Sequence, residues 1–521
     1  MRAYINDSLR AAISYVILYF GLLACGWQRV QLLAFSFNQQ RLKRNYGITR
    51  DTPVLSYGPE VVQSIRTNAG KDAKFATTSG TTGEPKELLY TKRRLLALKL
   101  AFSEMFAGAC YAFRLKRTSL YVFSSFEADT SLTSLLLDET ALPHYLSTLQ
   151  APYRLQHHPA LQALVSKYGA TAVRLWILTL SNPGVLYSTN PSTISTFLDE
   201  LINDWQRSSE LIRDWCYAPA SFAPEVHYIT RRLASRGCAK RLKQIANSSE
   251  PLPLSQYAPA VTAYICWTGG YVKPFLDRLA THLPSPRYEL IPMYSMSTET
   301  IETLPYFRDR EAAFLPFAPG VVYEFIDDAD NLLDAQQLEP GKLYAMVVSD
   351  PYGLRRYQTN DLFLCKRKIH GLPDLSFVRR QTLEYSVTGE KLTAEQLSIV
   401  FDQLRASYPS LLADRFLTCV PSQPPHYKVL LIGDQDSDVK NSHDILAKRC
   451  DELLCEINCE YRSKRASGRL GSVEVVSTKF KDFVALNSNW ETQFKFLPLA
   501  ANVNFHVARP WHPEEIMSSF E

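Results

Sequence analysis

A run of glycine, hydroxyl and lysine side chains near residue 80 is the strongest constraint on how this chain can fold. Residues 75–86 read FATTSGTTGEPK. The two glycines let the backbone turn and expose N–H groups that a side chain would otherwise block. The hydroxyls add short donors, and the lysine adds a mobile positive charge. A segment of this composition is suited to holding a polyphosphate. The residues of this segment that could bind phosphate are Ser79, Gly80, Thr81, Thr82, Gly83 and Lys86.

The local pattern predicts that this segment connects two strands. A nucleoside-triphosphatase P-loop requires Gly-x4-Gly-Lys-[Ser/Thr] leading into a helix. Here the lysine comes three residues after the second glycine, and residues 87–91 (ELLYT) are typical of a strand. A surface turn rich in Gly, Ser and Thr is the alternative interpretation. The length of the run and its Pro-Lys end favour phosphate binding.

Length and composition limit the remaining possibilities. A chain of 521 residues is too long for one core, so we expect two or three domains. The formal net charge of +5 is small and scattered, which argues against a nucleic-acid partner. The ten cysteines contain no C-x-x-C pair, and the closest spacing is Cys455 to Cys459. This pattern favours reduced thiols, as in the cytoplasm, over disulfides or zinc.

The N-terminus is strongly apolar. Residues 11–28 carry no charge and just reach the length of a membrane span. We expect residues 1–28 to form an apolar helix that packs on the protein or on another chain. Two alternatives remain open at this point: a membrane-associated anchor formed by residues 11–28, and an exported protein.

Alternating helix and strand patterns predict an α/β fold of layered sheets and helices. Thr91 is the expected N-cap of a helix that continues to Phe106. After residue 380 the pattern changes to a smaller α+β unit, with one long amphipathic helix over residues 439–461. The predicted division is therefore an apolar helix (1–28), a large nucleotide- and substrate-binding domain (29–380) and a small mobile C-terminal domain (381–521).

A second candidate site lies at residues 292–299 (PMYSMSTE). The hydroxyl of Thr298 and the carboxylate of Glu299 could bind phosphate and Mg²⁺, and Tyr294 could stack on a purine. The alternative is an ordinary helix N-terminus capped by Ser297, where Glu299 would favour the helix dipole.

Two further candidates follow. Asp361 comes after a turn-forming Thr-Asn pair, where its carboxylate could accept both hydroxyls of a ribose or simply bond to its own backbone. Arg379 and Arg380 end the segment 375–380 (LSFVRR), where they could reach phosphate or ribose oxygens or remain solvated charges.

The order of these four segments resembles that of the auxin-responsive Gretchen Hagen family of acyl-acid amido synthetases, a branch of the adenylate-forming enzymes. The resemblance covers about residues 30–500. It is carried by the phosphate loop, the Ser-Thr-Glu segment, Tyr-Gly-Leu-x-Arg-Tyr-x-x-x-Asp and Phe-Val-Arg-Arg. Residues 261–269 (VTAYICWTG), 389–397 (GEKLTAEQL) and 493–498 (QFKFLP) are also similar to family segments.

The resemblance implies specific roles. The loop and Lys86 would hold the β- and γ-phosphates. Thr298 and Glu299 would contact the α-phosphate and Mg²⁺, and Tyr294 would lie beside adenine. The remaining implied roles are the ribose contact at Asp361, the hinge at Arg379 or Arg380, and a bridge from Lys495 to the acyl carboxylate and α-phosphate.

Three departures from the family pattern affect these roles. Tyr294 is five residues before Glu299 instead of four, Asn360 stands where the family has glycine, and no arginine follows Pro498.

The expected activity is ATP- and Mg²⁺-dependent activation of a carboxylic acid as acyl-AMP, followed by transfer to an amine such as an amino acid. The alternatives are a ligase that uses coenzyme A or a carrier-protein thiol, and a nucleotide-binding relative without catalysis that serves as a partner subunit. We expect a cytoplasmic protein.

Overall fold

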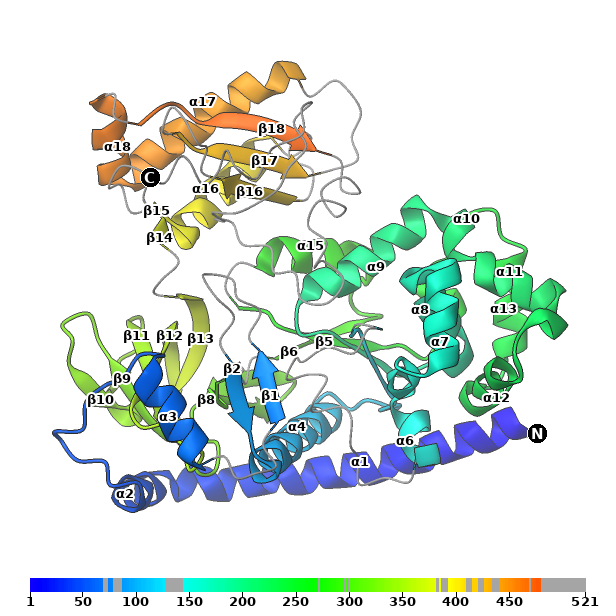
Figure 1. The fold of residues 1–521 in the computed structure, drawn as a ribbon, viewed down its shortest axis with the longest axis horizontal. Helices are drawn as coiled ribbons and strands as arrows, with labels where there is room; N and C mark the ends of the chain where they lie inside the picture. Colours follow the sequence, from blue (N-terminus) through cyan, green and yellow to red (C-terminus); the bar gives the residue numbers. More distant parts are fainter. Residues whose placement is uncertain are drawn as a thin grey trace.

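The computed structural model describes residues 1–68, 74–77, 87–124, 126, 144–269, 272–293, 297, 299–380, 384–385, 392–408, 415–419, 426–432, 440–467 and 470–478. In Figure 1, the strands of an antiparallel sheet lie at the left of the molecule, helices cover the right-hand end, and a smaller unit lies above them. This mixed arrangement confirms the predicted fold class: a large layered α/β part and a smaller α+β part.

A parallel sheet forms the centre of the helical half. Its strands are β3 (Leu120–Val122), β4 (Val185–Tyr187), β5 (Ala263–Cys266) and β6 (Glu289–Pro292), in that spatial order. Because the strands are parallel, all of their carboxyl ends lie at the same edge. Ligands of open α/β sheets bind at that edge.

Helices cover this sheet and supply most of its core. The apolar helix α8 is buried along most of its length, including Trp176. The helices of this half are α6 (His144–Gln150), η1 (Pro152–Leu155), α7 (Pro159–Tyr168), α8 (Ala170–Ser181), α9 (Pro191–Asn203), α10 (Trp205–Ser208), α11 (Glu210–Tyr217), η2 (Pro219–Ser221), α12 (Pro224–Leu233), α13 (Cys238–Ala246), α14 (Leu254–Tyr257) and α15 (Lys273–His282).

An antiparallel sheet forms the other half, in the order β10-β9-β11-β12-β13. Its strands are β9 (Val322–Ile326), β10 (Leu332–Asp334), β11 (Leu343–Ser349), β12 (Tyr357–Ile369) and β13 (Leu372–Arg380), with η4 (Ala335–Gln337) after β10. The hairpin of β7 (Leu304–Arg308) and β8 (Glu311–Leu315) packs beside β13. A second hydrophobic cluster fills this half.

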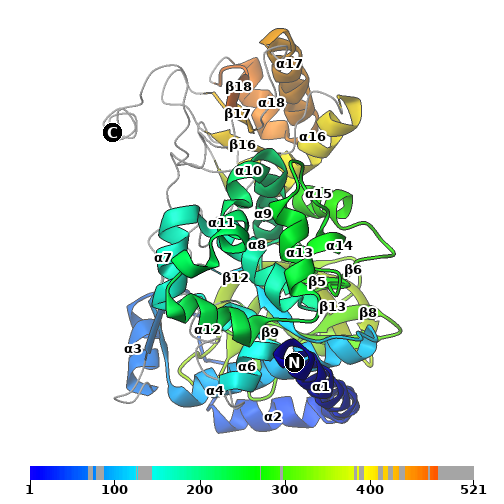
Figure 2. The same cartoon turned by 90° about the vertical axis from the view of Figure 1, so that its right-hand side faces the viewer.

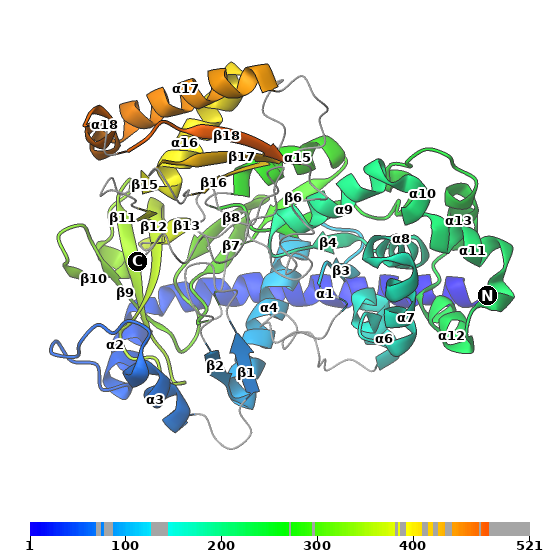
Figure 3. The ribbon, with the colours of Figure 1, turned by 45° about the horizontal axis from the view of Figure 1, so that its top comes forward.

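The N-terminal segments tie the two halves together. Helix α1 (Arg2–Leu33) runs along the base of the molecule and packs on α4 (Lys92–Ala112) (Figures 1 and 3). Between them come α2 (Phe35–Asn45), α3 (Pro59–Asn68), β1 (Lys74–Thr77) and β2 (Glu87–Tyr90). The apolar helix expected over residues 1–28 therefore continues to Leu33 and is followed at once by α2.

The C-terminal unit contains its own hydrophobic cluster, from Leu392 to Val475, and lies at the top in Figure 2. Its sheet has the order β16-β17-β18. Its elements are β14 (Glu384–Tyr385), β15 (Leu392–Thr393), α16 (Ala394–Ser407), β16 (Arg415–Cys419), β17 (Lys428–Ile432), α17 (Lys440–Ile457), α18 (Cys459–Ala466) and β18 (Glu474–Thr478). The boundary near 380 and the mobility of this unit stay predictions.

The single helix predicted over residues 439–461 is wrong. Helix α17 ends at Ile457, and Asn458 caps a separate helix α18 by accepting a hydrogen bond from the N–H of Tyr461 (2.8 Å). The Asn458 side chain also donates to Gln396 Oε1 (3.0 Å). Asparagine competes well for backbone N–H groups, and this stabilises the break between the helices.

Candidate functional site

The hairpin of β1 and β2 brackets the glycine-rich segment. The two strands pair antiparallel, with Lys74 opposite Tyr90 and Thr77 opposite Glu87. The prediction that two strands flank the segment is therefore confirmed. The six candidate phosphate ligands from Ser79 to Lys86 lie outside the described residues, and their roles stay predictions.

Helix α4 begins directly after this hairpin. Thr91 caps it by accepting a hydrogen bond from the N–H of Arg94 (3.0 Å), as predicted. Arg94 is only 3% exposed, because it shares the buried stripe of α4 with Leu98, Ala101 and Met105. The hairpin and the helix thus place the cation of Arg94 in the interior, shortly after the end of β2 in the chain.

The guanidinium of Arg94 joins three segments that are far apart in sequence. Its Nη2 donates a hydrogen bond to the carbonyl oxygen of Glu299 and lies 3.7 Å from Oδ2 of Asp350. It also lies 4.4 Å from the ring centroid of Tyr90 and 5.7 Å from that of Tyr352. The two rings offer π faces to the cation, and burial raises the pKa of the Tyr90 phenol to about 12.

Asp350 is the matching anion. Its Oδ1 accepts hydrogen bonds from the N–H groups of Tyr352 (2.8 Å) and Leu354 (3.0 Å). Burial raises the pKa of its carboxyl above the usual value, while Arg94 and the two N–H groups act in the opposite direction. The turn after β11 is therefore held to α4 by a buried ion pair, whose carboxylate is also hydrogen-bonded to two backbone N–H groups.

Gly353 lets the same turn pack against α3. Its φ is +117°, and an added Cβ would lie 2.8 Å from Cα of Ile65 and 2.9 Å from the carbonyl oxygen of Ser64. The hydroxyl of Ser64 donates to the carbonyl of Gly353 (2.6 Å). Only glycine combines this φ with so close a backbone approach.

Glu299 lies in a tight turn between β6 and β7, so the alternative of a helix N-terminus at Ser297 is wrong. The N–H of Ser297 donates to the carbonyl of Thr300 (3.0 Å), and the N–H of Thr300 donates back to Ser297 Oγ (3.3 Å). Glu299 is 2% exposed. Tyr294 and Thr298 lie outside the described residues.

Asp361 lies on β12 and is also 2% exposed. It pairs with Arg380 of β13 in the strand register, and Leu362 pairs with Arg379, so both arginines belong to the end of the strand. Asn360 has φ +63°, in the left-handed region that glycine and asparagine tolerate best. Asparagine at this position therefore holds a left-handed backbone that a glycine would also allow.

The carboxyl edge of the parallel sheet meets the antiparallel sheet close to these residues. Gly269, just after β5, would place a Cβ 3.2 Å from the carbonyl oxygen of Phe377 on β13. The rings of Trp267 and Phe377 lie 5.3 Å apart. The ends of β5 and β13 are therefore in direct contact.

The predicted residues thus fall into two described groups. Glu299 is joined to the turn after β11 through Arg94, and Asp361 is joined to Arg380 through strand pairing. Lys495 lies outside the described residues.

Within the described part of the chain, no group of three or more His, Cys, Asp or Glu side chains could hold a metal ion. Mg²⁺ in phosphate-using sites takes one or two carboxylates, with phosphate oxygens and waters completing the shell. The buried carboxylate of Glu299 suits that type of site and does not suit a metal cage made by protein alone.

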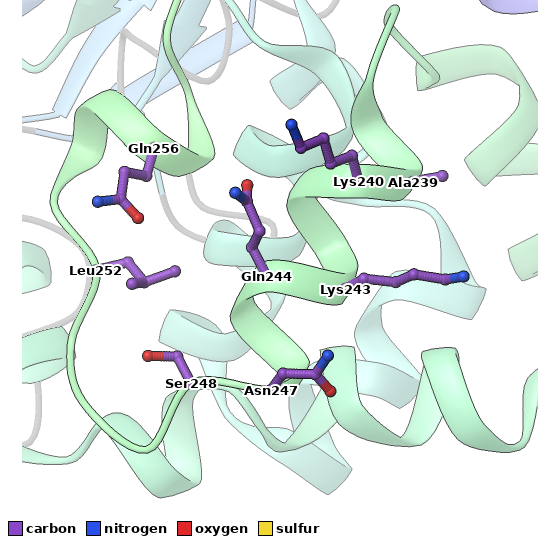
Figure 4. A pocket seen from close by; sticks show the side chains of 8 residues that line it. All are labelled: Ala239, Lys240, Lys243, Gln244, Asn247, Ser248, Leu252 and Gln256. Atoms are coloured by element: carbon purple, nitrogen blue, oxygen red, sulfur yellow. The ribbon is translucent and has the colours of Figure 1, made fainter.

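A surface depression of about 710 Å³ lies elsewhere, on α13 and the segment that leads to α14 (Figure 4). It is lined by Ala239, Lys240, Lys243, Gln244, Asn247, Ser248, Leu252 and Gln256. None of the predicted site residues lines it, and the depression is wide and open.

Sequence reasoning missed Arg94, and it gave Asp350 no role. One signal was available: Arg94 falls on the stripe 94-98-101-105 of α4, where every other member is apolar. An arginine on a buried stripe requires an anion or π partners in the interior.

The fold is that of the adenylate-forming enzymes. The structure matches 2-hydroxyisobutyryl-CoA ligase in a post-adenylation complex with R3-HIB-AMP, with a TM-score of 0.50, 10% identity and coverage of 94% of this chain and 89% of that chain. It matches the GH3.15 acyl acid amido synthetase in complex with 2,4-DB more closely, with a TM-score of 0.69, 17% identity and coverage of 98% and 93%.

Sequence comparison adds the family. The model of the GH3 family central domain matches residues 288–380, and that of the GH3 family C-terminal domain matches residues 396–500. The indole-3-acetic acid-amido synthetase GH3.4 of Arabidopsis thaliana is 22% identical over 323 residues, which are 55% of this chain and 51% of the relative. The match spans about half the length of this curated relative. The two regions that the family models match, which together make up less than half of the chain, are similar to the GH3 family, and the resemblance of the chain's motifs to the Gretchen Hagen enzymes is confirmed.

Proposed function

We propose that this protein is an ATP-dependent acyl-acid amido synthetase. It activates a small carboxylic acid as acyl-AMP with release of pyrophosphate, and then transfers the acyl group to an amine such as an amino acid. The observation that carries the proposal is the Arg94 cluster. It joins the helix after the phosphate-loop hairpin to the turn of Glu299 and to the turn of Asp350. Two of the family's motif segments therefore meet at one buried cation, which lies on the helix that follows a third.

In the first step, the carboxylate attacks the α-phosphorus and pyrophosphate leaves. Little covalent chemistry is required of the protein, which positions the reactants and neutralises the developing charge. The loop from Ser79 to Gly83 and Lys86 hold the β- and γ-phosphates in this proposal. Glu299 would hold Mg²⁺, which would supply further positive charge to the phosphates.

We assign the nucleoside end of ATP to the group that contains Asp361 and Arg380. Asp361 accepts the ribose hydroxyls, Tyr294 lies beside adenine, Thr298 contacts the α-phosphate, and Arg379 and Arg380 mark the hinge. The left-handed backbone at Asn360 and the pairing of Asp361 with β13 support the ribose role, because a bidentate acceptor requires a carboxylate held in a defined position.

The second step requires a different arrangement around the same carbonyl. The amine attacks the acyl-AMP carbonyl carbon, a C–N bond forms, and AMP leaves with the C–O bond electrons while the amine loses a proton. Lys495 acts only in the first step in this proposal, where it bridges the acyl carboxylate and the α-phosphate. The substrates are small molecules that occur in the cytoplasm, where ATP is present.

The test of the proposal is acid-dependent exchange of labelled pyrophosphate into ATP, measured with a panel of carboxylic acids. We expect exchange with at least one acid and a requirement for Mg²⁺. Lys86→Ala should lower the exchange rate at least about tenfold, because one well-placed charge on the phosphates is worth that much or more. The melting temperature should stay at the parent value. Exchange at the parent rate in Lys86→Ala would remove the loop from the mechanism.

A further inference from the structure

Helix α1 turns its polar side toward the protein. Asn6, Arg10, Ser14 and Gln28 are all buried. Asn6 Nδ2 donates to the carbonyl of Ala234 just after α12 (2.8 Å), and Arg10 donates to the last carbonyl of α12 (2.6 Å). Farther along, Ser14 accepts from a backbone N–H before β3 (3.1 Å), and Gln28 donates to a β7 carbonyl (3.1 Å). The helix is therefore attached along its length by polar contacts.

The crossing with α4 is equally close. Gly21 is buried, and an added Cβ would lie 2.7 Å from Cβ of Tyr111. This contact and the polar contacts fix the rotation of α1 about its axis. The opposite side of the helix must then face outward.

That opposite side is apolar and exposed, and we call it the α1 outer face. Helix α1 forms the lower edge of the molecule in Figure 1. The face consists of Tyr15, Val16, Tyr19, Phe20, Leu22, Leu23, Trp27, Val30 and Leu33. Exposure reaches 76% at Tyr15 and 86% at Leu33, so large apolar side chains stand in water on this edge. A continuous patch of this kind marks an interaction surface.

The width of the α1 outer face indicates whether its partner is a single helix or a flat surface. Val16, Phe20, Leu23, Trp27 and Val30 follow a 4-3-4-3 spacing, which one partner helix could cover as a coiled-coil seam. A second exposed row lies beside the first, where a coiled coil would carry charged residues. Its apolar members are Tyr15, Tyr19, Leu22 and Leu33, and exposed Gly26 and Arg29 lie between the last two. The face is therefore too wide for a single helix and suits a flat apolar medium.

The charge pattern around the α1 outer face indicates whether its partner surface is anionic or cationic. The sequence contains no aspartate or glutamate between Asp7 and Asp51. Arg29 on α1 and Arg41 and Arg44 on α2 are exposed. A second copy of the chain would bring cations against cations, whereas an anionic surface attracts them. Tyrosine and tryptophan, which are abundant on the face, also favour the boundary between acyl chains and headgroups.

We propose that the α1 outer face docks the protein on an anionic lipid bilayer, with the helix lying in the plane of the surface. Length and composition alone would allow α1 to cross a membrane. Crossing would require the helix to leave the body and expose the polar groups of Asn6, Arg10, Ser14 and Gln28, which now bond to the protein. Lying on the surface keeps every one of these contacts and buries only the apolar side.

The test is vesicle flotation of the full-length chain. Vesicles of phosphatidylcholine with phosphatidylserine should carry the protein upward, and phosphatidylcholine alone should carry less. Added salt should reduce the floated fraction, because the arginine contribution is screened. The double variant Phe20→Glu/Trp27→Glu should lower partitioning about tenfold or more, because two buried apolar side chains are lost. Its circular dichroism and melting temperature should match those of the parent.

Matched controls come from apolar residues exposed elsewhere. Tyr217 on α11 is 71% exposed and Ile445 on α17 is 53% exposed. Tyr217→Glu/Ile445→Glu adds the same charge and should float like the parent. Equal loss in this control would show a general charge effect and overturn the assignment to α1.

The depth of Trp27 distinguishes a docked helix from a crossing one. Lipids brominated near the headgroup should quench Trp27 more than lipids brominated near the chain end, and Trp27→Phe should remove this quenching. Three outcomes overturn the proposal: a folded full chain that does not float, deeper quenching with resistance to alkaline extraction, and a dimer that Leu23→Glu dissociates while flotation is unaffected.

Discussion

Arg94 is the residue that most determines how the candidate site is assembled. It is a buried cation with a carboxylate, a backbone carbonyl and two aromatic rings around it. A buried pair of this kind contributes little net stability over an apolar replacement, but breaking it from one side is costly. Its value lies in fixing the relative positions of the turn of Glu299 and the turn of Asp350.

Arg94→Met should therefore lower the free energy of unfolding by about 3 kcal/mol or more, because it leaves Asp350 as an uncompensated buried charge. Adding Asp350→Asn should recover part of this loss. Arg93→Met, at the exposed neighbouring position, is the control and should stay within about 0.5 kcal/mol of the parent. Urea unfolding measures all four proteins, and an Arg94→Met loss no larger than that of Arg93→Met would contradict the account.

At the level of residues, the sequence predicted the roles of individual residues better than their contacts in space. Thr91 was identified as a cap because a hydroxyl before an apolar stripe has one common structural meaning. Glu299 was left open between a first-turn residue of a helix capped by Ser297 and a site residue, and the structure removes the helix. Arg94 could not be assigned a partner, because its contacts at Glu299 and Asp350 are more than two hundred positions away. Long-range pairing of this kind leaves no local pattern.

At the level of elements, the positions of glycines and the spacing of apolar residues explain most of the helices and strands that the sequence predicted. Helix α15 was expected over residues 273–282 and ends at those positions, because apolar residues repeat at helical spacing between a proline and a run of turn residues. The sequence did not predict which side of α1 packs against the protein. Hydropathy treats an apolar helix as one that buries its apolar side, and only the contacts show that α1 buries its polar side.

Gly353 permits a prediction about how α3 holds the turn after β11. Gly353→Ala should cost about 2 kcal/mol or more, because it adds both left-handed strain and a 2.8 Å contact with the backbone of α3. Gly341→Ala is the matched control: its φ is +86°, but nothing lies within 4 Å of an added Cβ. That variant should cost about 1 kcal/mol, from strain alone. Thermal unfolding compares the two, and equal losses would show that the contact with α3 contributes nothing.

At the level of the whole molecule, the large part and the C-terminal unit were separable in the sequence because each has its own hydrophobic pattern. The unit has its own cluster of buried residues in the structure. Adenylation and transfer require different groups around one carbonyl, and a small domain that turns about a hinge near Arg380 could supply each in turn. This movement is a proposal that rests on the proposed function.

The movement leads to a prediction for Lys495. Lys495→Ala should slow acyl-AMP formation by roughly 10²–10³-fold, because the lysine stabilises charge between the carboxylate and the α-phosphate. The transfer step should continue near the parent rate when synthetic acyl-AMP is supplied. Both half-reactions are measured on the same purified variant. Equal damage to both steps, or to neither, would remove Lys495 from the first step.

The most direct test of the central claim is the identity of the product. The full-length protein is incubated with ATP, Mg²⁺, an acid that supports pyrophosphate exchange, and a mixture of amino acids and coenzyme A, and the products are analysed by mass spectrometry. We predict an amide between the acid and an amino acid, with one AMP released for each amide formed. A thioester of coenzyme A as the sole product, or free acyl-AMP that no amine consumes, would contradict this prediction.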